Sequence, residues 1–574
     1  MTRTELADLI FPDAKDTSYY EEKYPERQLP DGAVVTRFAP SPTGFVHIGA
    51  LEQCIVETSL KKQTNGVLIL RIEDTDQKRK VENGVQGIID SMKDFDIVFD
   101  EGMISETESV GEYGPYIQTQ RREIYQAYAK KLLIEDKAYP CFASEEELAE
   151  LRKKQEDEKI DNIGYYGKWA IYRSLPIEEA AKRIKNGDSY VIRFKSEGRE
   201  DGRITHNDMV KGKVEMPQNI LDVVIIKGDG LPTYHFAHAV DDHLMHTTHV
   251  IRSNEWFPSV PLHLELFRAL GFKAPKYCHY APMLKSEPKT DENGNIVYDE
   301  DGSVVTFKRK ISKRKDPEAA VSYYHKEGIP AESVKEYLMT IANSDFEMWR
   351  QSNPDADLYD FPFKLKKMST TEGALFDMDK LIDVSKNVIA TFSAEKVYND
   401  AYEWAKRYDD VLKSMLDDRE YSLKVLGIER GADIKKKRKD IGKWSDVRDY
   451  ISYMYDCQFY TDDLKFDYQL INDPATLSKI FKLYADKYYD ESDDNQAWFN
   501  KIKDLAEEVG YAREVKIWKK DKESWPGHVG DVSTALRIAV TGRSNTPDLC
   551  QIMQVMGTKR VKERLEYAAK MLSN

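Results

Sequence analysis

The stretch from Arg37 to Ala50 has residue types and a spacing suited to holding a phosphate group. Two prolines and Thr43-Gly44 favour a fixed turn. A helix that begins near His47-Ile48-Gly49 would aim free backbone N–H groups at a ligand, and His47 would add a side-chain donor. Gly49 would let that ligand approach the backbone closely. A turn that serves packing alone has the same pattern, so this stretch predicts a phosphate site only together with other evidence.

A basic stretch far downstream offers the complementary charges. Its sequence is Lys308-Arg309-Lys310-Ile311-Ser312-Lys313-Arg314-Lys315. Such a run is usually a solvated surface and sometimes a nucleic-acid patch. Lys310 and Lys313 bracket Ser312, so a tight loop would aim both ammonium groups at the same phosphates.

The elements that would position these residues alternate between strands and helices. Ala33 to Thr36 predicts a short β-branched strand before the first loop, and Leu51 to Leu60 has apolar residues at helical spacing after it. Gly66 to Ile72 predicts a buried parallel strand, and Val81 to Phe95 predicts an amphipathic helix. This alternation predicts an α/β doubly wound half that binds a nucleotide.

Taken together, the two loops resemble the paired signatures of class I aminoacyl-tRNA synthetases. The stretch from Arg37 to Gly44 looks like the version in glutamyl-tRNA synthetases, because glutaminyl enzymes have Glu and Asn where Ser41 and Thr43 stand. The resemblance runs from about Ala33 to the end of the chain. Further segments similar to that family are Leu70 to Asp76, Asp229 to Trp256 and Leu536 to Gly542.

The resemblance implies a two-step reaction. The α-carboxylate of glutamate attacks the α-phosphate of ATP, and a ribose hydroxyl at the 3′ end of tRNA(Glu) then takes the acyl group. Such chemistry needs donors to phosphate oxygens, and His47, Lys310 and Lys313 are the predicted catalytic residues. A lone histidine is more often structural and a lysine-rich loop more often solvated, but their joint occurrence in one α/β fold favours catalysis. The implied cofactor is ATP with Mg²⁺.

The substrate side chain is an anion, and a fork-shaped guanidinium holds a carboxylate better than a lysine does. Arg37 and Arg252 are therefore the predicted carboxylate ligands. Glu73 would hold the ammonium group of glutamate, although such a residue is more often a surface charge at a strand end. By resemblance the glutamate contacts are Arg37, Ala39, Ser41, Glu73, Tyr234 and Arg252. The ATP contacts implied in the same way are His47, Gly49, Glu255, Trp256, Leu284, Lys310, Ser312 and Lys313.

Metal sites other than Mg²⁺ are not expected. Many bacterial members of the resembled family begin a zinc site with Cys-x-Cys, whereas this chain has Cys141-Phe142-Ala143, which predicts no zinc. A dense histidine run comprises His235, His238, His243, His246 and His249. Asp241-Asp242-His243 is similar to a metal-free strand–helix turn of the family, so structural or hydrogen-bonding roles are favoured over metal binding.

Domain organisation follows from changes in pattern and from the resemblance. Long helices and then strands interrupt the alternation, which predicts an α+β insertion that holds the tRNA acceptor end. Two turn signals around Ile296-Val297-Tyr298 predict an inserted hairpin, and the chain after Pro317 is nearly all helical, with breaks at Ile329-Pro330 and Thr391 to Ser393. The predicted segments are 1–32, an extension packed on the first domain; 33–117, the first half of a Rossmann catalytic domain; 118–220, the inserted acceptor-binding domain; 221–316, the second half with the lysine loop; 317–394, a helical stem-contact domain; and 395–574, a helical anticodon-binding domain.

Composition narrows the setting in which the protein works. The chain has 574 residues and 5 cysteines without metal-ligand or redox spacing, and it has no signal-peptide core or membrane-spanning run, which predicts a cytoplasmic location. A monomer is expected. The formal net charge of -15 argues against a simple nucleic-acid binder. Local basic clusters lie at 308–315, 435–439, 516–522 and 559–564. The hypothesis is that the acidic body of the protein repels RNA except in one orientation, in which the RNA meets the basic faces.

Two other functions remain as alternatives at this stage. Relatives that attach glutamate to a modified tRNA base lack a C-terminal half, which this chain has. A non-catalytic tRNA-binding regulator on the same fold would have no need of His47, Lys310, Lys313, Arg37 and Arg252. The sequence leaves open whether tRNA(Gln) is charged as well as tRNA(Glu).

Overall fold

In the computed structural model the chain forms two units, which are described separately. One comprises Met1–Tyr323 with Lys335–Asp377, and the other comprises Tyr324–Val334 with Met378–Asn574. The structure describes residues 1–79, 81–369, 373–431, 434–435 and 437–572.

A parallel sheet organises the first unit. Strands β1 (Val35–Phe38), β2 (Val67–Leu70) and β3 (Glu101–Met103) pair in parallel, and β4 (Ser109–Val110) adds an antiparallel edge. On the other side of β1, β10 (His249–Ser253) pairs in parallel with β11 (Lys276–Tyr280). The N–H of Thr248, just before β10, donates to the carbonyl of Val35 at 2.9 Å and so joins β10 to β1. The order β3-β2-β1-β10-β11 is that of a doubly wound nucleotide-binding sheet, which confirms the predicted class.

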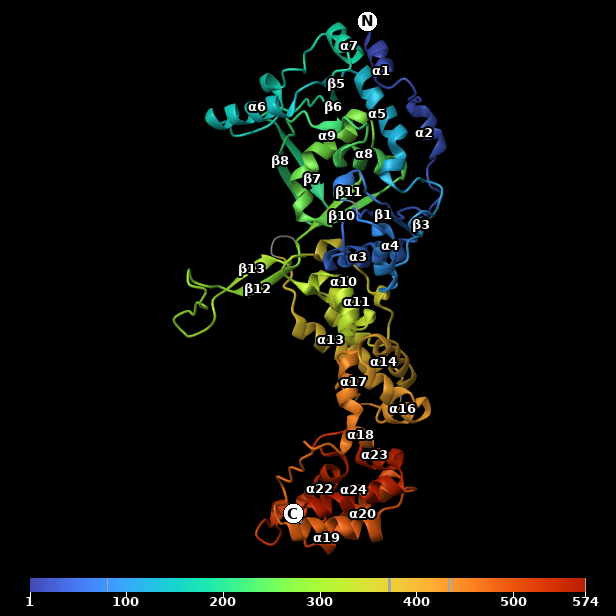
Figure 1. The fold of residues 1–574 in the computed structure, drawn as a ribbon, viewed down its shortest axis with the longest axis vertical. Helices are drawn as coiled ribbons and strands as arrows, with labels where there is room; N and C mark the ends of the chain where they lie inside the picture. Colours follow the sequence, from blue (N-terminus) through green and yellow to red (C-terminus); the bar gives the residue numbers. More distant parts are fainter. Residues whose placement is uncertain (80, 370–372, 432–433, 436, 573–574) are drawn as a thin grey trace. The chain divides into compact units, whose positions relative to one another are not determined.

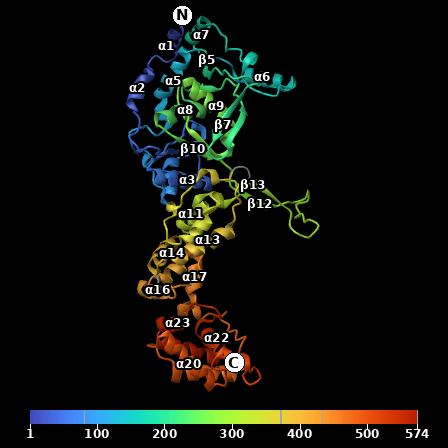
Figure 2. The ribbon, with the colours of Figure 1, turned by 180° about the vertical axis from the view of Figure 1, so that it is seen from behind.

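Four helices accompany this sheet. They are α3 (Ile48–Thr64), α4 (Gly84–Lys93), α8 (Tyr234–Leu244) and α9 (Val260–Leu270). Helix α4 begins three residues later than the predicted amphipathic segment from Val81. Figure 2 shows α8 and α9 together near β10, and α8 packs on α9.

An insertion of mixed helices and strands follows the first half of the sheet. Its elements are α5 (Arg122–Ile134), β5 (Ala138–Cys141), α6 (Glu145–Asp157), α7 (Ile177–Lys185), β6 (Val191–Phe194), β7 (Arg203–Asp208), β8 (Gly212–Pro217) and β9 (Val224–Ile226). The expectation that the parallel alternation resumes at Leu221 to Ile226 is wrong. Strand β9 pairs antiparallel with β6, whereas the parallel pairing resumes at β10. Because α5 covers β5 and β9, an antiparallel strand there is as apolar as a parallel one.

The N-terminal extension packs on the first unit, as expected. Its helices α1 (Arg3–Ile10) and α2 (Thr17–Lys23) both contact α5. Beyond them, the hydroxyl of Tyr24 donates to the carbonyl of Gly114 at 2.7 Å, and Arg27 forms an ion pair with Glu101 at 2.5 Å. The extension is therefore anchored to the first half of the sheet.

The predicted hairpin is an arm that projects from the first unit in both views (Figures 1 and 2). Strands β12 (Leu284–Pro288) and β13 (Thr306–Lys310) pair antiparallel at its base. The segment Ile296 to Tyr298 lies between two turns near the tip. There the N–H of Val297 donates to the backbone carbonyl of Lys289 at 2.9 Å. Strand β13 runs directly into the lysine loop, so the arm and the loop are one continuous structure.

The regular secondary-structure elements after Pro317 are all helices in the described residues. They are α10 (Val321–Glu327), α11 (Ala331–Ala342), α12 (Phe346–Ser352), α13 (Met378–Thr391), α14 (Ala394–Tyr408), α15 (Asp410–Leu416), α16 (Arg419–Leu426), α17 (Trp444–Ile451), α18 (Asp456–Phe459), α19 (Pro474–Leu483), α20 (Asn495–Glu508), α21 (Val515–Lys520), α22 (Val529–Thr541), α23 (Leu549–Met556) and α24 (Thr558–Met571). Both predicted helix breaks are confirmed. Buried side chains from α13 to α24 form one extended apolar cluster.

The predicted basic clusters differ in exposure. Lys436 lies outside the described residues, so the cluster at 435–439 is seen only in part. Arg564 is not part of a basic face, because it is buried and donates to the carbonyls of Tyr453 and Val540 at 2.6 and 2.8 Å. Within the residues that the structure describes, every helix is too short or too polar to cross a membrane.

Candidate active site

The loop after β1 places His47 at the N-terminus of α3. The ring Nδ1 of His47 accepts the backbone N–H of Gly49 at 3.0 Å, so the histidine caps the helix. Burial, reinforced by the ammonium groups of Lys313 and Lys310, lowers the pKa of His47. Because Nδ1 accepts from Gly49, the proton of a neutral ring lies on Nε2, which is the side-chain donor that the sequence predicts. A Cβ at position 49 would lie 3.2 Å from Nδ1 of His47, which explains the glycine there.

The lysine loop folds back onto this first loop. Lys313 Nζ donates to the carbonyl of Phe45 at 2.9 Å and lies 4.9 Å from the centre of its ring. Lys310 pairs with Glu255 in the short turn Asn254–Ser259, and the N–H of Ser312 donates to Asp316 at 2.7 Å. The two loop signatures, more than 250 residues apart in sequence, are thus in direct contact.

Arg37 and Arg252 come from neighbouring strands at the switch point of the sheet. Arg37 lies on β1 and Arg252 on β10, where strand order reverses and where open α/β sheets bind their ligands. Arg37 Nε donates to Asp242 at 3.2 and 3.3 Å, and both side chains are buried. Burial alone would raise the pKa of Asp242, but the guanidinium groups of Arg37 and Arg71 hold it well below its usual value.

Arg252 is held by neutral groups. Its Nε donates to His279 Nε2 at 2.9 Å, one terminal nitrogen donates to the Tyr234 hydroxyl at 3.3 Å, and the other donates to His263 Nδ1 at 3.1 Å. These contacts use three of the five N–H groups of a guanidinium. Among the described residues, no protein acceptor takes the remaining two, and Arg252 is 4% exposed.

Aromatic and acidic side chains lie beside these two arginines. The ring of Tyr234 lies 4.4 Å from that of Trp256, centre to centre, so Tyr234 forms a wall beside Arg252. Glu73 is buried and accepts from Arg71 at 3.3 Å. Burial raises the pKa of Glu73, although Arg71 and Arg37 oppose this. Arg37, Arg252, Tyr234 and Glu73 therefore lie close together, and their binding of glutamate stays a prediction.

The other predicted contact residues differ in exposure and in the use of their backbone groups. Ala39 is half-buried and Ser41 is exposed on the loop after β1. Both backbone groups of Leu284 are used, because its N–H donates to Ala374 at 2.9 Å and its carbonyl accepts from Phe376 at 2.7 Å. A ligand at Leu284 would meet its side chain rather than a free backbone group.

Several residues that support the site had no role assigned from the sequence. Arg71 on the segment after β2 donates to Asp242 at 2.6 Å and lies 3.7 Å from Asp241. Arg121 donates to Asp241 at 2.7 Å. The tandem aspartates were expected in a strand–helix turn, which is wrong: they lie in the last part of α8. Two adjacent acids on α8, close to the buried His238, were the signal that could have pointed to this network.

The histidine run divides between the pocket and the periphery. His235 and His238 on α8 lie near Arg252, and burial lowers the pKa of each to about 4. His243 instead pairs with Glu21 of the N-terminal extension at 3.0 Å. Within the described residues no cluster of histidine, cysteine and acidic side chains has the arrangement of a metal site.

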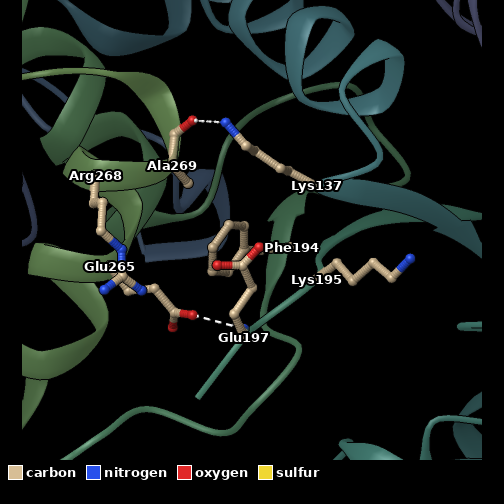
Figure 3. Close-up of a pocket in the computed structure, with 7 residues that line it drawn as sticks. All are labelled: Lys137, Phe194, Lys195, Glu197, Glu265, Arg268 and Ala269. Atoms are coloured by element: carbon tan, nitrogen blue, oxygen red, sulfur yellow. Dashed lines mark hydrogen bonds between the residues drawn. The ribbon is translucent and has the colours of Figure 1, made fainter.

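A separate cavity of about 200 Å³ lies where α9 meets the insertion (Figure 3). Its lining residues are Lys137, Phe194, Lys195, Glu197, Glu265, Arg268 and Ala269. Lys137 Nζ donates to the carbonyl of Ala269 at 2.8 Å, and the N–H of Glu197 donates to Glu265 at 2.8 Å. These contacts fasten the insertion to the sheet, and the lining includes none of the predicted site residues.

Comparisons with known proteins agree with this geometry. Residues 33–291 match the family of class I tRNA synthetases (E and Q), catalytic domain, and residues 412–569 match an anticodon binding domain. A glutamate–tRNA ligase of Acetivibrio thermocellus is 48% identical over 99% of this chain and 100% of its own length. One of Sorangium cellulosum is 43% identical over 97% of this chain and 99% of its own.

A solved structure supports the same conclusion. The glutamate tRNA ligase of Elizabethkingia meningosepticum, in complex with its amino acid, superposes with a TM-score of 0.70 at 26% identity, covering 94% of this chain and 99% of that one. Sequence and fold thus agree over nearly the full length. The chain belongs to the glutamate–tRNA ligase family of class I aminoacyl-tRNA synthetases.

Proposed function

We propose that this site carries out the two steps of a glutamate–tRNA ligase, with Arg37 and Arg252 binding the side-chain carboxylate of L-glutamate. The observation that supports this proposal is the pair of N–H groups on Arg252, a residue only 4% exposed, for which no protein acceptor is found among the described residues. A buried guanidinium with two free donors matches a carboxylate in a bidentate arrangement. Glu73 holds the ammonium group of the substrate, and Tyr234 and Ser41 border the ligand.

ATP binds along the edge formed by the two loops. His47 Nε2–H and the ammonium groups of Lys310 and Lys313 donate to phosphate oxygens and stabilise the charge that develops as the α-carboxylate attacks. Lys310 is paired with Glu255, and Lys313 donates to Phe45, both at exposed positions. Because these acceptors lie at the surface, ATP phosphates can displace them at small cost. Gly49, Trp256, Leu284 and Ser312 surround the nucleotide.

Mg²⁺ accompanies the ATP phosphates, and no zinc is bound. Cys141 is buried, and its thiol lies 3.5 Å from the hydroxyl of Tyr165. This contact, together with Phe142-Ala143 after it, supports a structural role for Cys141. Elemental analysis of the purified protein is expected to find no stoichiometric zinc, and one tightly held zinc per chain would contradict this.

The helical C-terminal unit binds the anticodon end of the tRNA, and the insertion between the halves of the sheet binds the acceptor end. The protein acts as a monomer in the cytoplasm. Its described cysteines are all free thiols, which suits a reducing compartment.

The test is ATP–pyrophosphate exchange with glutamate in the presence of saturating tRNA, followed by charging of purified tRNA(Glu) and tRNA(Gln). Glutamate-dependent exchange and charging of tRNA(Glu) are expected. Binding of tRNA without any exchange would overturn the catalytic assignment in favour of a tRNA-binding regulator. The charging of tRNA(Gln), measured alongside, distinguishes a discriminating enzyme from one that charges both tRNAs.

A further inference from the structure

A chain of buried hydrogen bonds runs from the insertion to Arg252. Asp208 at the end of β7 accepts from His279 Nδ1 at 2.7 Å, and His279 Nε2 accepts from Arg252 Nε at 2.9 Å. Asp208 and His279 are 1% and 0% exposed. The chain ends at the guanidinium that receives the substrate, although Asp208 belongs to the inserted β7–β8 hairpin and not to the sheet.

The partners of His279 dictate which of its nitrogens carries the proton. Arg252 can only donate, so Nε2 must accept and must be unprotonated. The proton of the neutral ring therefore lies on Nδ1, where only an acceptor is tolerated, and Asp208 supplies that acceptor. Burial lowers the pKa of His279 to about 4, so the ring is neutral near physiological pH. Burial would raise the pKa of Asp208, but donors from His206, His279 and the backbone hold it below its usual value.

Asp208 also has a local structural task. Its Oδ1 accepts the backbone N–H groups of Val210 and Lys211 at 2.9 and 3.0 Å and so shapes the β7–β8 turn. The second oxygen, Oδ2, accepts from the ring Nδ1 and from the backbone N–H of His279, at 2.7 and 3.2 Å, and lies 3.9 Å from Nε2 of His206. Shaping the turn requires one acceptor oxygen, which an asparagine would also provide. Fixing the His279 tautomer requires a second acceptor oxygen, which the carboxylate of aspartate provides and the amide of asparagine does not.

We infer that Asp208 and His279 are positioning residues for glutamate recognition, which orient Arg252 by holding His279 as an acceptor. This inference rests on the proposed role of Arg252. Arg252 is then oriented to bind the substrate carboxylate only when the insertion packs against β11. Glutamine, whose neutral amide offers Arg252 one acceptor oxygen and no opposite charge, gains less from this arrangement than glutamate does.

The substitution Asp208→Asn tests the inference with nearly unchanged shape. With its oxygen kept at the turn, the amide NH₂ faces Nδ1 of His279, which must then accept, and Nε2–H would point at the N–H of Arg252. Specificity constants for glutamate and glutamine are measured by ATP–pyrophosphate exchange with saturating tRNA. The KM for glutamate is expected to rise at least about tenfold and the preference over glutamine to fall similarly, since a hydrogen bond to a charged group is lost. The KM for ATP is expected to change less than about twofold.

The variant His279→Gln provides a rescue. Its carbonyl oxygen can reach the former position of Nε2 and accept from Arg252 without help from Asp208. This variant is expected to keep most of the preference for glutamate, whereas His279→Leu loses it. In the His279→Gln background, adding Asp208→Asn is expected to change the preference less than about threefold, because the two residues act through one tautomer.

Asp222→Asn is the matched control. Asp222 is another buried aspartate of the insertion, and it accepts from Tyr139 at 2.7 Å and from Arg173 at 2.5 Å. Its substitution should lower stability and leave the amino-acid preference unchanged. An unchanged preference in a folded Asp208→Asn, or equal losses in His279→Gln and His279→Leu, would overturn the inference. If both Asp208→Asn and Arg252→Gln leave the preference for glutamate unchanged, the proposed role of Arg252 is wrong as well as the inference. If Arg252→Gln lowers the preference and Asp208→Asn does not, Arg252 keeps its role and the inference alone is wrong.

Discussion

The proposed glutamate pocket and the proposed phosphate edge hold their charged side chains in opposite ways. In the proposed pocket, Arg37 and Arg71 both form ion pairs with Asp242, at 3.2 and 2.6 Å, and all three side chains are almost fully buried. At the edge, Lys310 and Glu255 form a pair whose side chains are 46% and 55% exposed. The first arrangement is preorganised for one ligand group, whereas the second consists of contacts that water can replace.

This difference in exposure predicts which substitutions change folding stability and which change the rate of the chemical step. A buried charge network must remain complete, because removal of one partner leaves the other charge desolvated without compensation. An exposed ion pair contributes little to stability, so its members are free to bind phosphate instead. Substitutions in the pocket should therefore affect folding and amino-acid choice, and substitutions at the edge should affect the chemical step.

The largest expected effect on stability comes from Asp242→Asn. This substitution removes the carboxylate between Arg37 and Arg71, and it should lower the free energy of unfolding by about 3–5 kcal/mol. Glu255→Gln, which removes the carboxylate partner of Lys310 at the exposed edge, should change it by less than about 0.5 kcal/mol. Denaturant unfolding of both variants checks the contrast. Equal losses would mean that burial does not distinguish the two regions.

Lys313→Ala is expected to slow the reaction strongly and to leave folding stability nearly unchanged. Loss of one charge contact to the transition state costs roughly 3 kcal/mol, or about two decades in the exchange rate. The free energy of unfolding should stay within about 0.5 kcal/mol of the parent value. Lys315→Ala, an equal loss of charge two residues further along, should slow exchange less than about threefold. A near-normal turnover in Lys313→Ala would remove that residue from the catalytic set.

A smaller effect is expected where the edge depends on a tight turn. In Gly49→Ala the new methyl group would lie 3.2 Å from Nδ1 of His47, so the ring must shift. The exchange rate should fall about tenfold, with the KM for glutamate unchanged, since the cost is that of a strained hydrogen bond. Gly87→Ala on α4, where nothing lies within 4 Å of the added Cβ, should leave the rate unaffected. Equal behaviour of the two variants would argue against the capping role of His47.

The sequence predicts the phosphate edge better than the pocket for a physical reason. His47, Gly49, Lys310 and Lys313 act from two contiguous loops, so spacing along the chain carries their geometry. The supporting residues of the pocket, such as Asp208, Asp242 and His279, come from three separate elements and meet only through tertiary packing. The pairing of β9 escaped prediction for a similar reason, because an apolar run does not reveal the direction of its neighbour.

The central claim is that Arg37 and Arg252 form a pocket for a carboxylate. It is tested most directly by the specificity constants of the wild-type protein for glutamate and glutamine, measured by ATP–pyrophosphate exchange with saturating tRNA. An amide would turn its NH₂ donors toward guanidinium donors, so glutamate should be preferred by at least about a thousandfold. Arg252→Gln should erode that preference, because it removes the charge and leaves a group compatible with an amide. Equal use of glutamine by the wild type would contradict the account.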